Sequence, residues 1–374
     1  MTATMSGSDG DSTAADDATA GTGNAACAVA PEDWAAPDWD LNAAEALALR
    51  AQLDTLTGDA TMRGAETGAV MIEDLAQLLA AWEDGDPSLA AVANPGYVPV
   101  IEASFDEFLE ILAAGEQSLV DMNGAWAPGP AGGIWADDDR GINEGGLEVR
   151  QLVDKGGYSG GILYAYALGL TEGEIDAATV EAIAAAWGAN AQLDPDGELT
   201  DAAGYALQMG FHAEMAGALA TAQVLSGNAE CVAERDEALV TFFSRWEQSM
   251  YARLVFYVAR AEGKLLAATT ETELASVLHD VAEGVGVAAA FIGLPDPDSG
   301  PLSGAGRLIT DAEVLEIMGA MGVNLDDLGA STSGSFVESL PALEDARAQI
   351  ESTVMTVYGL DAATVMAYAM PTPG

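Results

Sequence analysis

Apolar residues recur at helical spacing through almost the whole chain from about residue 41 onward, and this pattern limits the fold more than any other feature. In residues 41–56, Leu49, Leu53 and Leu56 lie three or four residues apart among good helix formers. Segments in which apolar and polar residues alternate, as they do in half-buried strands, are essentially absent. The sequence therefore predicts an all-α protein of about eight to ten helices, packed as up-and-down helical bundles.

Local signals predict where several of these helices begin and end. A capping box is a Ser or Thr followed three residues later by Glu, and it marks a helix start. Such boxes begin at Ser104, Thr171, Thr270 and Thr310. Glycine favours the left-handed conformation in which many helices end. We expect helix ends at Gly115, Gly188, Gly319 and Gly359.

The chain is extremely acidic, with 60 Asp and Glu against 12 Lys and Arg and a formal net charge of −48. Its hydrophobic fraction of 50% is ample for a core, so the charge does not indicate general disorder. Repulsion among surface carboxylates opposes compaction in dilute buffer. Salt relieves this repulsion, because the Debye length falls from about 10 Å at 0.1 M to about 3 Å at 1 M. We therefore expect a protein adapted to high salt.

The same charge limits the possible partners. Phosphate binding needs a basic stripe, so we expect no nucleic-acid partner, and anionic membrane surfaces are disfavoured for the same reason. A cationic ligand or a metal ion would be attracted. No apolar run reaches the roughly 18 residues of a membrane helix, so we expect no transmembrane segment.

Residues 1–38 are expected to form a disordered, acidic, low-complexity tail, and residues 39–374 the helical domain. No signal peptide is visible, because the N-terminus has neither a basic start nor an apolar stretch. Tails of this kind often follow an export signal or a lipid anchor. Cys27 and Cys231 would be able to pair if the protein is exported, and the sequence leaves that pairing open.

A long segment rich in Gly and Pro, residues 120–146, interrupts the helical pattern. Loops of this length inside a compact domain are often functional. Trp126 and Trp135 are candidate ligand contacts, although burial of their rings against the helices would explain them equally. Asn143 and Glu144 offer oxygen ligands, but the spacing of the acidic residues does not match an EF-hand.

His212 and Glu214 are the candidate metal ligands. They stand two residues apart, which is roughly 200° around a helix, so a regular helix does not aim them at one ion. A buried packing role for His212 is the alternative. Gly210 and Gly217 flank this histidine among alanines and predict close approach of a neighbouring helix. His279 reads as an ordinary packed side chain.

Basic residues are so scarce that their positions carry information. Arg245, Arg253 and Arg260 fall within about 80° of one another on one predicted helix. Ion pairs with acidic residues of neighbouring helices explain this stripe, and a pocket for an anion or carboxylate is the alternative. Arg253 and Arg260 are therefore candidate ligand-binding residues. No Walker loop and no HExxH motif is present, so binding is a better expectation than catalysis.

The order of several short motifs resembles imelysin-related proteins over about residues 142–360. The segments are GLEVRQLVDKGGYSGGILYAYALGL, GFHAEMAGALA, RDEALVTFFSRWEQSMYARLVFYVARAEGKLL, LHDVAEGVGVAAAFIGLP, LITDAEVLEIM and TVYGL. The nearest branch is a bacterial lipoprotein family of unknown function. Its glutamine-leucine-x-x-lysine-glycine segment matches here at Gln151, Leu152, Lys155 and Gly156. Its aspartate-glutamate-alanine-phenylalanine-glycine helix matches at Glu214 and Gly217, with Ala213 in place of the aspartate.

The resemblance implies an all-α fold of two bundle halves, exported to the periplasm or cell surface. Imelysin relatives are described both as proposed metallopeptidases and as iron-linked or ligand-binding envelope proteins. Their hallmark is Gly-x-His-x-x-Glu, which here reads Gly210, His212 and Met215, so the final Glu is replaced. That departure weakens the expectation of a metal site.

Together these features predict an extracytoplasmic helical binding protein, with a lipid anchor as one option. Its expected ligand is a small molecule, a divalent metal or iron. A metal-dependent peptidase or hydrolase is one alternative. A structural envelope protein without a small ligand is the other.

Overall fold

The computed structural model describes residues 27, 29, 33–35, 37–120, 132–135, 139–296, 301–331 and 339–370. It is 65% helix and 3% strand, which confirms the prediction of a mainly helical chain. The α-helices are α1 Trp39–Asn42, α2 Ala44–Thr57, α3 Met62–Glu66, α4 Leu75–Glu83, α5 Leu89–Val92, α6 Val98–Ala114, α7 Arg150–Gly156, α8 Leu163–Gly169, α9 Ala177–Trp187, α10 Asp201–Gln208, α11 His212–Leu225, α12 Val232–Ala267, α13 Glu271–Ala290, α14 Asp311–Ala320, α16 Leu340–Tyr358 and α17 Ala362–Ala369. Shorter turns are the π-helical η3 Gly157–Gly161 and the 3₁₀ turns η4 Leu170–Glu172 and η5 Phe291–Gly293.

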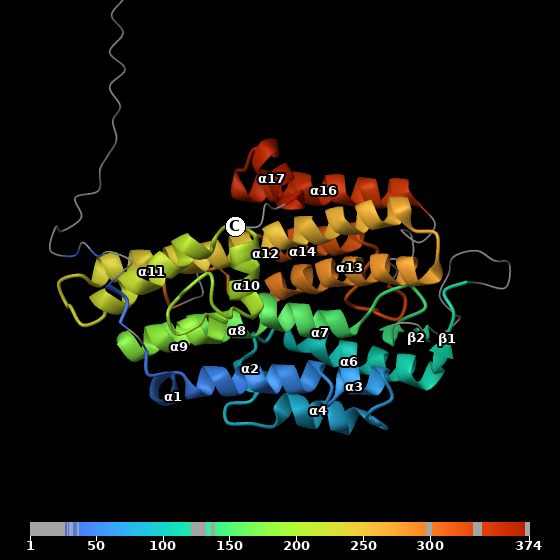
Figure 1. Cartoon of the computed structure of the whole chain (residues 1–374), viewed down its shortest axis with the longest axis horizontal. Coiled ribbons are helices and arrows are strands. Elements are labelled where there is room, and N and C mark those ends of the chain that lie inside the picture. The colour runs from blue at the N-terminus through green and yellow to red at the C-terminus, as the bar shows by residue number, and fades with distance from the viewer. Residues whose placement is uncertain are drawn as a thin grey trace, which may run out of the picture.

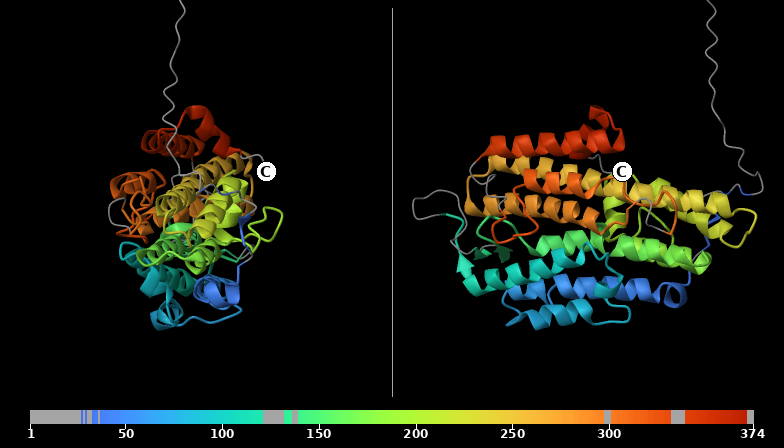
Figure 2. Two further views of the ribbon diagram at one scale, coloured as in Figure 1. Left: turned by 90° about the vertical axis from the view of Figure 1, so that its left-hand side faces the viewer. Right: turned by 180° about the vertical axis from the view of Figure 1, so that it is seen from behind.

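Most of the long helices run along one common direction and form an elongated body (Figure 1). The N-terminal helices α2, α4 and α6 lie along one side and the C-terminal helices α16 and α17 along the other (Figure 2). Helix α12 has 36 residues, a length of about 54 Å. It contacts α10, α11, α13, α16 and α17, so it is the element shared by most of the C-terminal half.

Aromatic side chains fill the core beside α12. Phe242, Phe243 and Trp246 are fully buried, and their rings meet edge to face or stacked. Tyr164 of α8 lies 5.1 Å from the ring of Phe243 and 5.3 Å from that of Trp246. Large buried rings contribute apolar area and favourable ring geometry together, so this cluster fixes α8 against α12.

Two of the expected capping boxes are formed. The hydroxyls of Thr270 and Thr310 accept from the backbone N–H groups three residues later. The side chains of the Glu residues at those positions accept in turn from the backbone N–H groups of the two threonines. The other two expected starts are wrong. Ser104 lies inside α6, where its hydroxyl donates to the carbonyl of Val100. Helix α9 begins after Asp176, whose carboxylate caps it, and not at Thr171.

Three of the four expected helix ends are confirmed, because Gly115, Gly188 and Gly359 follow the last helical residue of α6, α9 and α16. Gly319 lies within α14 instead, and Gly322, with φ of +75°, stands just beyond that helix. A Cβ added at Gly319 would have no atom within 4 Å, so packing does not require a glycine at this position.

A close helix approach that requires glycine occurs on α13. A Cβ built on Gly286 would lie 2.1 Å from the carbonyl oxygen of Gln151, so the α7 backbone packs directly on α13. A Cβ built on Gly210 or on Gly217 would have no atom within 4 Å. The two glycines therefore do not make the predicted close contact, although α11 does pack along α12.

A small sheet forms in the segment expected to be a long loop. Its strands are β1 Glu116–Gln117, β2 Gly133–Trp135 and β3 Arg140–Ile142. Strand β2 pairs parallel with β1 and antiparallel with β3. Gly133 adopts φ of +144°, and a Cβ there would lie 2.4 Å from the carbonyl oxygen of Gly115, so this turn requires glycine.

The described residues before α1 are attached to the helical body. Cys27 forms a disulfide with Cys231, at the start of α12. The indole N–H of Trp34 donates to the carbonyl of Ala191 at 3.1 Å. Described residues within the segment 1–38 thus make two specific contacts with the helical body.

Among the described residues, the helical stretch Glu271–Gly293 is long and apolar enough to span a membrane, with a mean hydropathy of 1.4. It consists of α13 and η5 and lies in the centre of the helical body, with 83% of its most apolar window buried (Figure 1). Packing in the core accounts for this composition.

Candidate functional site: a buried charge network and a caged arginine

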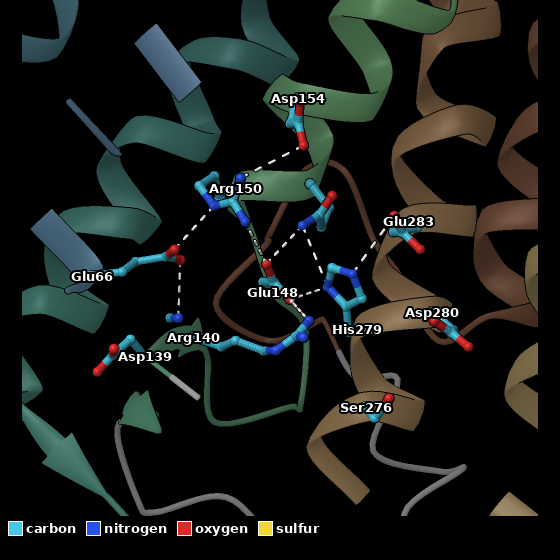
Figure 3. Close-up of polar contacts among 12 residues, drawn as sticks. Glu66, Asp139, Arg140, Glu148, Arg150, Asp154, Ser276, His279, Asp280 and Glu283 are labelled. Atoms are coloured by element: carbon cyan, nitrogen blue, oxygen red, sulfur yellow. Dashed lines mark hydrogen bonds and ion pairs between the residues drawn. The ribbon is translucent and has the colours of Figure 1, made fainter. Parts of the chain in front are cut away.

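Half of the chain's twelve Lys and Arg residues lie in one network of ion pairs, which we call the charge network. It joins α3, β3, α7, α12 and α13, and Figure 3 shows the part of it around Glu148 and His279. Its members are Arg63, Glu66, Arg140, Glu148, Arg150, Asp154, Lys155, Arg260, Lys264, His279, Asp280 and Glu283. Both lysines and one of the two histidines of the sequence are included. In so acidic a chain, this concentration of cations makes the region a candidate functional site.

Glu148 is the centre of the charge network and is completely buried. Its carboxylate accepts from Arg150 at 3.1 Å and from the amide of Gln151 at 2.7 Å, and it lies 2.7 Å from Nδ1 of His279. Burial by itself would raise the pKa of Glu148, but His279, Arg150 and Arg140 together hold that pKa well below its usual range. Glu148 is therefore a permanent buried anion.

Glu66 is the second buried carboxylate, and its environment has the opposite effect. Its carboxylate accepts from Nε of Arg150 at 3.0 Å and from the backbone N–H of Gly141 at 3.0 Å. Burial, assisted by the nearby charge of Glu148, outweighs these favourable contacts and raises the pKa of Glu66 from 4.5 to about 7. Glu66 can therefore gain or lose a proton near neutral pH.

His279 lies between two carboxylates. Its Nδ1 faces Glu148 and its Nε2 lies 3.6 Å from Glu283, one turn further along α13 (Figure 3). Metal-binding histidines commonly give their second ring nitrogen to a carboxylate in this way. Ligand atoms of His279, Asp280 and Glu283 all lie within 4.8 Å of one another, so these three residues have the spacing of a metal site.

Three cations already neutralise the carboxylates of that cluster. Arg260 pairs with Asp280 and with Glu283, each at 2.6 Å. Lys264 pairs with Asp280 at 2.8 Å, and Lys155 lies 3.4 Å from Glu283. A divalent cation bound here would meet three positive groups and only two carboxylates. The arrangement is thus better suited to holding α7, α12 and α13 together than to binding a metal.

Arg253 lies about two turns of α12 from Arg260, the nearest member of this network on that helix, and has a different environment. It is 7% exposed, and its guanidinium carbon lies 4.6, 4.7 and 4.3 Å from the ring centroids of Tyr205, Phe256 and Tyr257. It donates to the side chains of Gln208 and Tyr257. We call these five residues the arginine cage. Within the described parts of the chain, no carboxylate forms an ion pair with Arg253, and its Nε has no hydrogen-bond partner.

The arginine cage and the charge network meet at Tyr257, a cage residue that Arg260 of the network also contacts. The guanidinium of Arg260 lies 5.0 Å from the ring of Tyr257, on which Arg253 also packs. Lys155 also interacts with this phenol: although burial would lower the pKa of Lys155, the neighbouring Tyr205, Asp154 and Tyr257 keep it above its usual value. Arg253, Lys155 and Arg260 therefore lie around one buried tyrosine, and of the three only Arg253 has no carboxylate partner among the described residues.

The two candidate metal ligands of the sequence are not brought together. His212 is buried and stacks on Trp187 with ring centroids 5.4 Å apart. Glu214 is half exposed and pairs with Arg245 at 2.8 Å. Their different directions follow from their two-residue spacing on α11. Of the arginine stripe, Arg245 and Arg260 make the expected ion pairs with neighbouring helices, whereas Arg253 does not.

The candidates in segment 120–146 have structural contacts where they are described. Trp135 packs in a small cluster with Leu119 and α13. The adjacent cavity is only about 10 Å³, room for about one water molecule. Asn143 is buried and its amide bonds backbone groups, among them the carbonyl of Leu328. Glu144 is exposed. Trp126 lies outside the described residues.

Sequence reasoning missed Glu66, Glu148 and the role of His279. One signal was available, because Glu148, Arg150, Asp154 and Lys155 crowd a segment that also contains buried apolar positions. Charges in a buried helix need partners, and few cations were available elsewhere.

A second overlooked pattern is Gly-x-Ser-x-Gly at residues 157–161. In hydrolases this motif forms a sharp turn between a strand and a helix, which exposes the serine. Here it lies between α7 and α8, and Ser159 is 1% exposed with its hydroxyl unpartnered among the described residues. The turn does not present a nucleophile.

Comparison of the chain with protein-family models, with curated proteins and with solved structures gave no match. The resemblance to imelysin-related proteins accordingly rests on the short motifs alone, and function has to be argued from the geometry of the site.

Proposed function

We propose that this protein is an extracytoplasmic, imelysin-like binding protein of two bundle halves that binds a small carboxylate ligand at the arginine cage. The observation that carries the proposal is Arg253, a guanidinium that is 7% exposed and has no carboxylate partner among the described residues. Buried charges in proteins are paired, because removing them from water is costly. In a chain with 60 acidic residues, the absence of an internal partner leaves the position open to an external one.

The chemistry of the cage fits a carboxylate. Arginine offers five N–H donors in a planar fork that matches two carboxylate oxygens. Two donor contacts of Arg253 are used, by Gln208 and Tyr257, and Nε is free. The rings of Tyr205 and Phe256 offer apolar contact beside the guanidinium. An acid with an aromatic or short aliphatic body has the two chemical features, a carboxylate and an apolar part, that these contacts would recognise.

The disulfide supports an extracytoplasmic location. Stable disulfides form in secreted and periplasmic proteins and are rare in the cytosol. Cys27 and Cys231 are the two cysteines of the sequence, and they are joined. An envelope protein facing a saline medium would also explain the excess of acidic residues.

The test is ligand-dependent thermal stability of the full-length, disulfide-bonded chain at constant ionic strength. Benzoate and succinate replace part of the chloride in 2 M potassium salt, so that screening stays the same. A ligand at 100 times its Kd stabilises a protein by about 2.7 kcal/mol. We expect a saturable rise of several degrees in Tm for at least one acid. The rise should be absent in Arg253→Met and retained in Arg347→Met, a paired arginine on α16 that serves as the matched control.

The proposal fails if neither acid raises the Tm of the wild type above that in chloride. It also fails if Arg253→Met shows the same rise as the wild type. Native mass spectrometry of the protein purified in high salt gives an independent readout, since a bound acid would add its mass to the wild type but not to Arg253→Met.

A metal or iron ligand is the second candidate, and the spacing of His279, Asp280 and Glu283 is the observation that favours it. Elemental analysis of protein purified in high salt separates the two. About one transition metal per chain, lost in His279→Ala and retained in His212→Ala, would support the metal site. A metal lost only in His212→Ala would instead support the imelysin-type position.

A further inference from the structure

The arginine cage is closed in this structure. Nε of Arg253 is buried from water and has no hydrogen-bond partner among the described residues. The other two guanidinium nitrogens are occupied, because Nη1 donates to the amide oxygen of Gln208 and Nη2 donates to the hydroxyl of Tyr257 at 2.8 Å. A carboxylate that binds an arginine in the fork-shaped arrangement needs two N–H groups. An external carboxylate therefore reaches this guanidinium only after part of the cage has moved.

The cage is built from two helices, which differ in how freely they can move. Phe256 and Tyr257 belong to α12, as does Arg253 itself, whereas Tyr205 and Gln208 belong to α10. Helix α12 has 36 residues and packs on α11, α13, α16 and α17, so its displacement would disrupt the core. Helix α10 has eight residues and lies beside α12 (Figure 1). Opening of the cage is therefore expected to be a movement of α10.

Helix α10 is attached to the body by little apolar surface. Its fully buried side chains, among those that the structure describes, are Ala202, Ala203 and Ala206, and a methyl group buries little apolar area. Gly204, in the middle of the helix, lowers its helix propensity. Leu207 borders a hollow of about 290 Å³ beside α11, so α10 is not closely packed on that side. Segments with few buried apolar contacts open locally at a lower free energy than the whole fold.

We propose that α10 is a lid over Arg253, and that Gln208 keeps this lid shut by occupying the guanidinium in place of a ligand. The amide oxygen of Gln208 accepts from Nη1 as a carboxylate oxygen would, so the lid and the ligand compete for one donor. The ring of Tyr205, 4.6 Å from the guanidinium carbon, moves away with the same helix. The fraction of molecules with an open lid then scales the apparent affinity for a carboxylate. The inference rests on the proposed function for what enters the cage, but the movement of the lid is testable without any acid.

The rate of thiol alkylation measures how often the lid opens. The two cysteines of the sequence are joined in a disulfide, so Ala206→Cys adds the one free thiol, at a fully buried position of α10. Ala252→Cys, equally buried on α12, is the matched control. The full-length, disulfide-bonded variants react with N-ethylmaleimide, an uncharged reagent, in 2 M KCl, and mass spectrometry of the intact chain gives the rates. We expect Ala206→Cys to react at least about tenfold faster, because α10 opens without the core.

Two substitutions of Gln208, made together with Ala206→Cys, move the lid in opposite directions. Gln208→Met keeps the length and helix propensity of the side chain and removes the acceptor. Alkylation should then be about tenfold faster, the effect of losing one hydrogen bond to a charged group. Gln208→Glu gives the guanidinium an internal carboxylate and should slow alkylation several-fold, because a charged acceptor bonds more strongly.

Equal alkylation rates for Ala206→Cys and Ala252→Cys overturn the lid. Equal rates with Gln, Met and Glu at position 208 overturn the role of Gln208. If Ala206→Cys does not fold, as judged by circular dichroism, hydrogen exchange of the α10 amides in the wild type, Gln208→Met and Gln208→Glu makes the same comparison without an added thiol.

The affinity for benzoate and succinate gives a second readout of the competition. Gln208→Met should bind about tenfold more tightly whichever acid stabilises the wild type, because the internal competitor is gone. An unchanged affinity for that acid would overturn the competition while leaving the proposed function intact. Absence of binding by the wild type would instead contradict the proposed function, and the alkylation rates then decide on the lid alone.

Discussion

Substitution of Glu66 by Gln should remove a defined part of the pH dependence of stability. The pKa of the carboxylate is 4.5 in an unfolded chain and about 7 in the folded protein, so the folded state binds a proton more tightly. A raised folded-state pKa stabilises the fold at low pH, and this stabilisation is lost as the pH rises through about 7. Each pKa unit corresponds to about 1.4 kcal/mol, so the difference from 4.5 to about 7 corresponds to about 3 kcal/mol.

Urea unfolding between pH 4.5 and 8 in 2 M KCl measures this effect. Glutamine resembles the protonated acid and does not titrate, so the variant should gain about 3 kcal/mol relative to the wild type over that range. The absolute stability of the variant is not the test, because the amide changes the contact with Arg150. Titration of the many surface carboxylates affects both proteins equally and cancels in the difference. Parallel pH profiles for the two proteins would refute the reasoning.

Three further predictions concern stability. Gly286→Ala should lower the free energy of unfolding, measured in urea, by roughly 2–3 kcal/mol, the cost of overpacking, since its Cβ would lie 2.1 Å from the carbonyl oxygen of Gln151. Gly284→Ala is the control: its Cβ would lie no closer than 3.5 Å to any atom, so this variant should be neutral or stabilising. Replacement of Cys27 and Cys231 by Ser should cost up to about 5 kcal/mol by loop entropy for a separation of 204 residues; an unchanged Tm would show that the bond constrains nothing. The Tm of the wild type should rise steeply between about 0.1 and 2 M KCl because of screening, and a flat response would remove the argument for salt adaptation.

Local sequence signals predicted local structure well. The capping boxes at Thr270 and Thr310 and the terminal glycines Gly188 and Gly359 need only neighbouring residues to act, and each is found where expected. Ser104 shows the limit of this reasoning. The same box pattern lies inside α6, because the helix continues through apolar residues that the core buries.

The site was harder to predict because its parts are distant in sequence. Glu66 and Arg150 are 84 residues apart, and Glu148 and His279 are 131 apart. No spacing rule connects such positions, and only the tertiary structure brings them together, in which α7 packs on α13 and Arg150 bonds Glu66 of α3. The scarcity of cations did identify Arg253 and Arg260 in advance, but not which of the two would lack an acidic partner.

The location of both lysines has a practical consequence for chemical labelling. Lys155 and Lys264 are charge-network members with side chains 19% and 36% exposed, and each is bonded to a carboxylate. Amine-reactive dyes, cross-linkers and immobilisation supports therefore act on the network itself, apart from the chain's amino terminus. The rate of acylation at these two positions becomes a reporter of how often α7, α12 and α13 separate. Attachment chemistry that must leave the fold undisturbed should be directed at carboxylates instead.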